Sequence, residues 1–231
     1  MLDTSKIKTS YQLQQIKQFA ESNEMRINSF KTKITVFNKS LKYDVMPEIN
    51  TFSEDNLEVV EEYKILGLVI SANMKWSSHT KYICKRGYIQ LWTLRRLKKL
   101  GANINILLDL YNKQVRSIVE YAAPAWQSML TEENKADIER VQKCAFSIIF
   151  GPKSYEKTLK NENIKSLEDR RVDLTNKFAN KCSKSPHFST WFTKKQQIVN
   201  TRNPKIYKEV PARCNRWMTS PIPYMTRSLN N

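Results

Sequence analysis

The sequence predicts an α+β protein that is predominantly α, and three observations support this class. Two short stretches near the start have the alternating or continuous apolar pattern of strands. From about residue 79 onward, apolar residues recur at helical spacing. Beyond Pro186 this periodicity is lost among prolines and cations. We therefore expect three parts: a helix with a small antiparallel sheet in 1–71, a helical bundle in 72–185 and an irregular, partly disordered basic tail in 186–231.

The first part is expected to contain one amphipathic helix and two or three strands. The helix is predicted over Tyr11–Glu24, with Ser10 as its N-cap and with Leu13, Ile16, Phe19 and Ala20 on one face. The strands are predicted at Thr32–Phe37 and Lys64–Ile70, with Leu57–Val60 as a candidate third. So few elements leave open sheet edges and one bare face. This part is therefore expected to be cut from something larger.

The second part is expected to be a bundle whose consecutive helices pack antiparallel, because its loops are short. Its first helix is predicted from His79 to Leu100, ending at Gly101. The second carries an apolar stripe and is ended or kinked by Pro124. The stripe consists of Ile104, Leu107, Leu108, Tyr111, Val115, Ile118, Val119 and Ala122. The remaining helices are predicted over Glu132–Phe150 after the cap Thr131, over Tyr155–Lys160 and over Leu167–Cys182.

Composition narrows the class of protein further. The four cysteines are far apart and only two histidines accompany them, so free thiols are expected rather than a zinc site. No run approaches the roughly 20 apolar residues of a membrane helix, and the polar start has no signal-peptide centre. We expect an intracellular protein that is not secreted and has no membrane partner, and the choice between nucleus and cytoplasm stays open.

The 231 residues carry a formal charge of +17, and the charges are segregated. Between residues 48 and 62 every charged residue is acidic, whereas between 75 and 100 every one is basic. Such asymmetry indicates distinct surfaces, and an excess of cations is typical of proteins that contact a phosphate backbone.

The predicted helix over residues 79–100 gives the clearest binding pattern. One face carries Lys81, Lys85, Tyr88, Trp92, Arg95, Arg96 and Lys99, and the other carries Ile83, Gly87, Leu91, Leu94 and Leu97. Cations interleaved with aromatic rings can neutralise phosphates and stack on bases. Alternatively, Tyr88 and Trp92 belong to a wider apolar face and the lysines are merely solvated.

Seven short segments form a recognisable series along the chain: Asn28–Lys33, Tyr63–Ile70, Trp76 with His79, Arg116–Ala122, Val141–Lys143, Ser154–Glu156 and Ser166–Arg171. In this order they resemble the end of the palm and the thumb of a reverse transcriptase from non-LTR (LINE-type, jockey-like) retrotransposons. The resemblance implies that Tyr63–Gly67 forms a primer-grip hairpin, in which Lys64 and Gly67 lie near the primer. It also implies that Lys31, between Asn28 and Thr32, has an accessory role in releasing pyrophosphate.

A polymerase of this family holds two Mg²⁺ ions on carboxylates, and the resemblance places its aspartate pair upstream of Tyr11. Here the adjacent carboxylates Glu54-Asp55 and Glu61-Glu62 follow the lysine segment instead. We therefore expect no catalytic residue other than the accessory Lys31, no metal ligand and no cofactor, since Mg²⁺ is implied only for the full-length polymerase. The expected partner is RNA or DNA, as a primer-template or a single strand, together with a missing N-terminal polymerase part.

The helical part matches the family less specifically. Arg116, Glu120, Tyr121, Pro124 and Trp126 resemble one of its helices, and Glu168, Arg170 and Arg171 resemble its last helix. For Glu120 and Glu168 we favour ion pairs that orient helices. Cys144 and Ser147 stand where the family has arginine, which argues against phosphate contacts there. Two alternatives stay open, a helical protein-interaction module with an acidic partner and a decayed element without a selected role.

Overall fold

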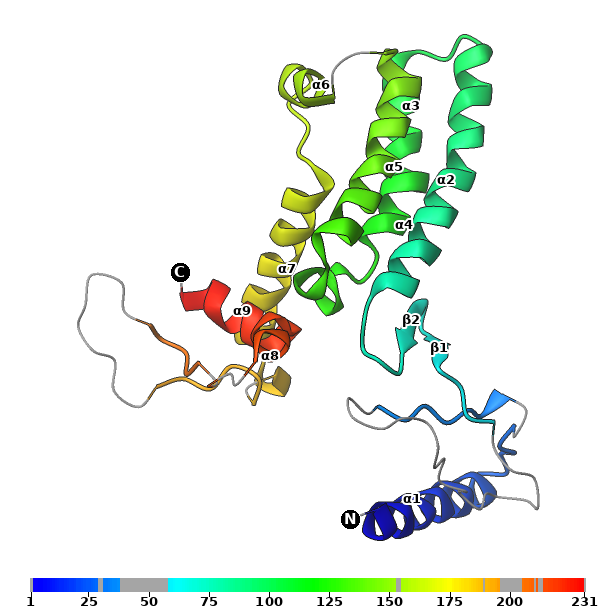
Figure 1. Cartoon of the computed structure of the whole chain (residues 1–231), viewed down its shortest axis with the longest axis vertical. Helices are drawn as coiled ribbons and strands as arrows, with labels where there is room; N and C mark the ends of the chain where they lie inside the picture. Colours follow the sequence, from blue (N-terminus) through cyan, green and yellow to red (C-terminus); the bar gives the residue numbers. More distant parts are fainter. Residues whose placement is uncertain are drawn as a thin grey trace. The chain divides into compact units, whose positions relative to one another are not determined.

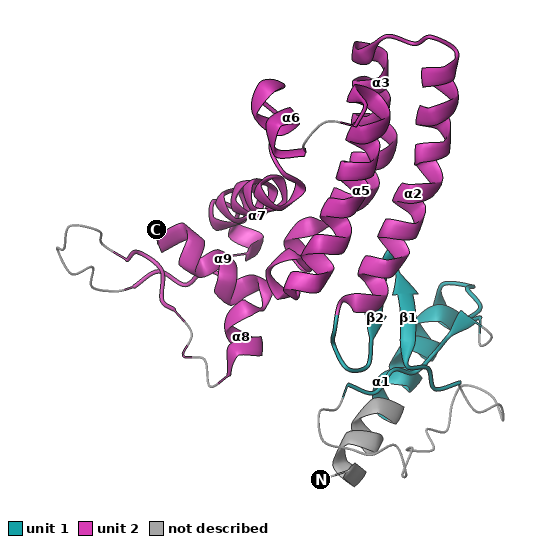
Figure 2. Cartoon of the chain, turned by 45° about the horizontal axis from the view of Figure 1, so that its top comes forward, with its two compact units in different colours: residues 1–75 teal, residues 76–231 magenta. Residues whose placement is uncertain are grey.

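The computed structural model describes residues 2–28, 31–37, 58–152, 155–188, 190–195, 205–209, 211 and 214–230, and for residues 2–10 only the backbone. The chain divides into two compact units, residues 1–75 and 76–231, which are described separately below (Figure 2). Within the described residues, helices predominate and one two-stranded antiparallel sheet is present (Figure 1). The predicted class, α+β and predominantly α, is confirmed. No helix among these residues combines the length and apolarity needed to cross a membrane.

The first unit begins with α1, Leu2–Ser22. The prediction that this helix starts after Ser10 is wrong, because the preceding residues include no glycine or proline that would stop it. Its C-terminus closes with Glu24 in the left-handed conformation and with the amide of Met25 donating to the carbonyl of Ala20 (2.8 Å). The predicted apolar face is only partly covered, since Ala20 is buried but Phe19 is 64% exposed.

Among the described residues, the strands predicted at Thr32–Phe37 and Leu57–Val60 appear as one isolated bridge between Ile34 and Val59, and this bridge is parallel rather than antiparallel as expected. The amide of Ile34 donates to the carbonyl of Glu58 (3.0 Å), and the amide of Val60 donates back to Ile34 (2.8 Å). The intervening residues 38–57, including Leu57, lie outside the described part of the chain. Alternation alone therefore overestimated the extent of this pairing.

The stretch predicted as one strand, Lys64–Ile70, is instead a hairpin of β1, Glu62–Ile65, and β2, Leu68–Ser71. Its two-residue turn has positive φ at Leu66 (48°) and at Gly67 (84°), as a type I′ turn requires. Glycine adopts this conformation without cost, whereas Leu66 is strained and points into solvent. The tight turn that the family resemblance implied at Gly67 is present.

In the second unit, three rods lie side by side (Figures 1 and 2). They are α2 (Ser77–Lys99), a rod formed by α3 (Ile104–Leu110), η2 (Tyr111–Arg116) and α4 (Ser117–Glu120), and α5 (Glu132–Phe150). Ser77 contacts Asn134 near the start of both α2 and α5, and the Lys98 ammonium donates to the carbonyl of Ile149 (2.8 Å) near both ends. Helices α2 and α5 are thus parallel, and the intervening rod runs antiparallel to both. The predicted antiparallel packing of consecutive helices is confirmed here.

The rod predicted as one α-helix consists of α3 (Ile104–Leu110), a π-helical segment η2 (Tyr111–Arg116) and α4 (Ser117–Glu120). Its fully buried side chains recur every four residues, at Leu107, Tyr111, Val115 and Val119. In an α-helix of 3.6 residues per turn this spacing would rotate away from the core. A π turn takes up more residues, so the mixed rod keeps all four side chains on one face. The rod ends before Pro124, as predicted.

Helix α5 has the predicted bounds, and the hydroxyl of its N-cap Thr131 accepts from the amide of Asn134 (3.2 Å). Helix α6, Tyr155–Asn161, and α7, Leu167–Ser183, also agree with the prediction to within a residue. The Ser166 hydroxyl caps α7 by accepting from the amide of Asp169 (3.0 Å).

The tail differs from the expected irregular chain. It contains η5 (Pro186–Phe188), α8 (Asn215–Thr219) and α9 (Pro221–Asn230). Phe192 and Met225 are buried against Ala179 and Cys182 of α7, forming a small second core. The prolines misled the prediction, since Pro221 occupies the first position of α9, where its fixed φ favours a helix.

Packing of α2 against α5 depends on Gly87. A Cβ atom added there would meet Cγ1 of Val141 at 3.0 Å and Cγ1 of Val119 at 3.4 Å. We predict that Gly87→Leu lowers the free energy of unfolding by about 1–3 kcal/mol in urea titrations, because the helices must separate. Lys85→Leu, at an exposed position of the same helix, should change it by less than about 0.5 kcal/mol. Equal effects of the two variants would contradict this account.

Candidate nucleic-acid interface

The exposed face of α2 carries the side chains that the sequence pattern placed there. Five cations, Lys81, Lys85, Arg95, Arg96 and Lys99, are exposed, as is Trp92, whereas Tyr88 is half-buried. On the other face Ile83, Gly87, Leu91 and Leu94 are buried. Leu97, predicted for the same side, is half-buried, so the predicted division of the helix holds for four of these five residues. The alternative that places Trp92 in the core is wrong, and Tyr88 lies between the two interpretations. We call the five cations, Trp92 and Tyr88 the α2 face.

Aromatic rings on the α2 face are available for stacking. Trp92 is 60% exposed, and the Arg96 guanidinium lies 5.3 Å from the centre of its ring. A cation so placed holds the ring in position while leaving part of it open to a ligand. Burial raises the pKa of the Tyr88 phenol, which therefore stays neutral and able to donate a hydrogen bond at physiological pH.

Beside the α2 face, a hollow of about 590 Å³ opens between α2 and α5. Lys81, Lys85 and Tyr88 line it from α2, and Asp137 and Arg140 line it from α5. Arg140 pairs with Asp137 at 2.7 Å, yet its side chain is largely exposed. Sequence reasoning missed Arg140, although its place next to the buried Val141 on a well-predicted helix was a usable signal.

The cysteine in this hollow does not offer a nucleophile. Burial raises the pKa of the Cys84 thiol to about 12, so the thiolate is scarcely populated at neutral pH. Cys144 is half-buried and Ser147 exposed, and neither supplies the positive charge that the family has there. All four cysteines are free thiols, as predicted.

The remaining predicted contact residues belong to the first unit. Lys64 is exposed in β1, next to the turn at Gly67. The Tyr63 hydroxyl donates to the carbonyl of Lys31 (3.3 Å), which brings the lysine segment to the hairpin. Asn28 holds this segment, accepting at Oδ1 from the amide of Lys31 (3.0 Å). The structure thus joins Lys31 to the hairpin, and their contact with a primer stays a prediction.

Ion pairs explain several of the family-like residues in the helical unit. Arg170 of α7 donates through Nε and Nη2 to both carboxylate oxygens of Glu120 of α4, at 2.6 and 3.0 Å. Glu168 of α7 pairs with Lys135 of α5 at 2.9 Å. The predicted ion pairs of Glu120 and Glu168 between helices are confirmed, and their role in orienting the helices stays an interpretation.

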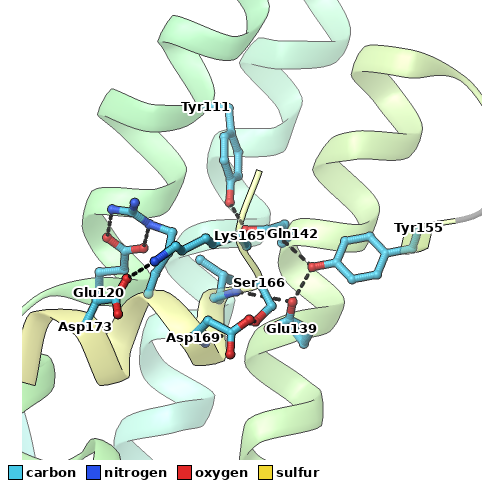
Figure 3. A network of polar contacts seen from close by, with 11 residues as sticks. Tyr111, Glu120, Glu139, Gln142, Tyr155, Lys165, Ser166, Asp169 and Asp173 are labelled. Carbon is cyan, nitrogen blue, oxygen red and sulfur yellow. Dashed lines mark hydrogen bonds and ion pairs between the residues drawn. The ribbon is translucent and has the colours of Figure 1, made fainter. Parts of the chain in front are cut away.

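A polar network centred on Gln142 joins three further segments (Figure 3). The buried Gln142 accepts from the Tyr111 hydroxyl (2.5 Å) and donates to the Tyr155 hydroxyl (2.8 Å) and to the carbonyl of Lys165 (3.2 Å). The Tyr155 hydroxyl in turn donates to Glu139. This network fixes α6 and the start of α7 on α5, and it needs no ligand to satisfy Gln142.

A stack of rings and a guanidinium fills the centre of the unit. Arg171 is fully buried, 5.9 Å from the ring centre of Trp126, and Trp126 lies edge-on to His79 at 5.3 Å. None of the Arg171 guanidinium nitrogens has a hydrogen-bond partner among the described residues. Burial lowers the pKa of Arg171, which nevertheless remains a cation at neutral pH. Arg171 therefore acts within the fold rather than at the surface.

The described residues contain no grouping of three His, Cys, Asp or Glu side chains able to hold a metal ion. Glu61 and Glu62 are exposed in and beside β1, and Glu54-Asp55 lie outside the described residues. The part of the chain that the structure describes thus does not fit the two-Mg²⁺ site of a full polymerase. No family model, curated protein or solved structure matches this chain.

His79 should make stability depend on pH. Burial lowers its pKa to about 4 from 6.5, so the unfolded chain takes up this proton first and stability is lost as the pH falls through this interval. We predict that the wild-type protein loses about 2 kcal/mol more than His79→Leu between pH 7 and pH 5 in urea titrations. His187→Leu, at the exposed second histidine, should keep the wild-type pH dependence. A wild-type slope in His79→Leu would disprove this assignment.

Proposed function

We propose that this chain is the C-terminal part of a non-LTR retrotransposon reverse transcriptase and that its helical unit binds RNA or DNA through the α2 face. The observation that carries the proposal is the α2 face itself, where cations and an exposed indole occupy one side of a long helix. From Lys81 to Lys99 it extends about 27 Å, which is the axial length of about eight nucleotides of one duplex strand. The tight hairpin turn at Gly67 and the order of the family-like segments support the family assignment.

The chain on its own is proposed to bind without polymerising. The aspartate pair that would hold two Mg²⁺ ions is not found upstream of Tyr11, where the family has it. A primer-extension assay with magnesium tests this part, and robust DNA synthesis by the isolated chain would contradict it. The exposed Phe19 of α1 offers an apolar surface on which a separate polymerase part could pack.

The cationic part of the interface is tested by Lys85→Ala/Arg95→Ala. We predict that this double variant binds a fluorescein-labelled RNA–DNA hybrid roughly tenfold more weakly and reduces the slope of log K against log[salt] by about 2, because two phosphate contacts are lost. Lys157→Ala/Lys160→Ala removes the same charge from the exposed side of α6 and should leave both quantities nearly unchanged. Fluorescence anisotropy at several salt concentrations measures both. Equal losses in the two variants would indicate attraction by net charge alone.

The aromatic part is tested by Trp92→Ala. Stacking on a base does not release counterions, so we predict a loss of about 1–3 kcal/mol in binding that is the same at low and high salt. Single-stranded oligonucleotides should show it most clearly, because their bases are accessible. An unchanged affinity would remove Trp92 from the interface.

A further inference from the structure

A second, apolar pocket lies in the helical unit, in the region formed by α7, α8, α9 and the turn after α4. Its volume is about 610 Å³. The side chains that matter here are Phe178, Trp191, Trp217, Pro221, Ile222 and Met225. Met225 is buried and belongs to the small core that fixes α9 on α7, so the floor of the pocket is part of the packed structure. The pocket is separate from the α2 face, whose residues do not line it.

Large aromatic side chains stand partly exposed at this pocket. Trp217 is 47% exposed, Trp191 38% and Phe178 37%. Helix α8, which carries Trp217, is attached to α9 by the Arg227 guanidinium donating to the carbonyl of Met218 (2.5 Å). Contact of these exposed apolar rings with water is unfavourable unless a partner covers them. Tryptophans of this kind are typical anchors of protein interfaces.

The charge of this region is strongly one-sided. Residues 174–231 contain eleven lysines and arginines, and Glu209 is their one acidic residue. On the helices that line the pocket, Lys177, Lys181 and Arg216 are exposed. A partner that reaches the pocket therefore meets an apolar wall on helices that also carry exposed cations.

We propose that this pocket docks an acidic peptide segment of a partner protein, with one or two large apolar side chains inserted between Trp217 and the first turn of α9. The chemistry of the wall favours a peptide over a nucleic acid. Apart from the Ser220 hydroxyl and the indole N–H groups of Trp191 and Trp217, the lining side chains carry no hydrogen-bonding group, so most polar atoms on the edge of a base would be buried without partners. A leucine or phenylalanine side chain has no polar group that would be left without a hydrogen bond there. Carboxylates that flank it in the peptide can reach the exposed cations of the lining helices.

A random peptide library displayed on phage, selected on the full chain and counter-selected on Trp217→Ala, tests the proposal. We expect the enriched peptides to combine Asp or Glu with Phe, Leu or Trp. Their affinity for Trp217→Ala should fall roughly tenfold or more, as for an interface anchor. Trp92→Ala, which removes an exposed indole from the α2 face, should bind them as the wild type does. Failure to enrich such peptides, or equal binding by both variants, overturns the proposal.

A second variant guards against a local change of fold in Trp217→Ala. Lys177→Glu/Lys181→Glu alters exposed residues of α7 only. It should lower the affinity for the acidic peptides and raise the affinity for versions of them with flanking lysines.

Two other results would overturn the proposal. An oligonucleotide that competes with the peptides and is itself weakened by Trp217→Ala would make this a nucleic-acid site. Self-association that Trp217→Ala abolishes in sedimentation would make a second copy the occupant. Loss of oligonucleotide binding through the α2 face leaves this test unaffected.

Discussion

The close contact of α2 with α5 at Gly87 is the constraint on which the helical unit depends. Val141 and Val119 lie against the glycine backbone, so no side chain separates α2 from its two neighbours at this point. Because this face of α2 packs inward, the helical repeat places the residues of the opposite face in solvent. The cations of the α2 face are therefore exposed because of a packing requirement on the other side of the same helix. Binding chemistry and core formation are properties of one sequence pattern.

Polar contacts add to the apolar packing of Ala179 and Cys182 in holding helix α7. Glu120 receives a bidentate pair from Arg170, and Gln142 fixes the segment just before α7. Arg171 places a buried cation next to the ring of Trp126, and its guanidinium has no hydrogen-bond partner within the described part of the chain. Burying a charge in this way is costly, and the aromatic ring offsets only part of that cost. We infer that these contacts select one orientation of α7 rather than simply adding stability. The tail packs on α7, so the second pocket depends on that orientation.

The elements that could be predicted from the sequence are those in which local and tertiary preferences agree. Helix α5 has a threonine cap, a continuous apolar stripe and a closing glycine, and its bounds were predicted correctly. The rod over residues 104–120 was predicted as a helix, but its π segment was not. Apolar residues spaced four apart lie close enough to the α-helical repeat of 3.6 to be taken for an α-helix. Leu66 was assigned to a strand, since leucine gives no signal for positive φ. Helix α9 was missed because proline was taken as a helix breaker, whereas Pro221 stands at the first position of this helix.

Only the part of the candidate site that lies on a single helix could be predicted from the sequence. The α2 face follows from residues on a single element, whose spacing is visible in the sequence. Arg140 adds charge from α5, and its position beside Lys81 depends on how two helices pack, which spacing within either cannot show. The second pocket is a still stronger case. Phe178, Trp191 and Trp217 belong to three segments, and their meeting depends on the fold of the tail.

Net charge does not distinguish the α2 face from the second pocket. Their uncharged side chains do. The α2 face carries cations, and the helices that line the second pocket also carry exposed cations, so both regions attract polyanions at long range. On the α2 face a ring beside Arg96 stands open, as stacking on a base requires. At the second pocket the rings belong to a concave wall that is mainly apolar, with the Ser220 hydroxyl and the indole N–H groups of Trp191 and Trp217 as its hydrogen-bonding side-chain groups, and such a wall suits an aliphatic or aromatic side chain. A chain of net charge +17 could in this way bind two kinds of acidic partner at once. Selectivity would then reside in shape and in hydrogen bonds rather than in charge.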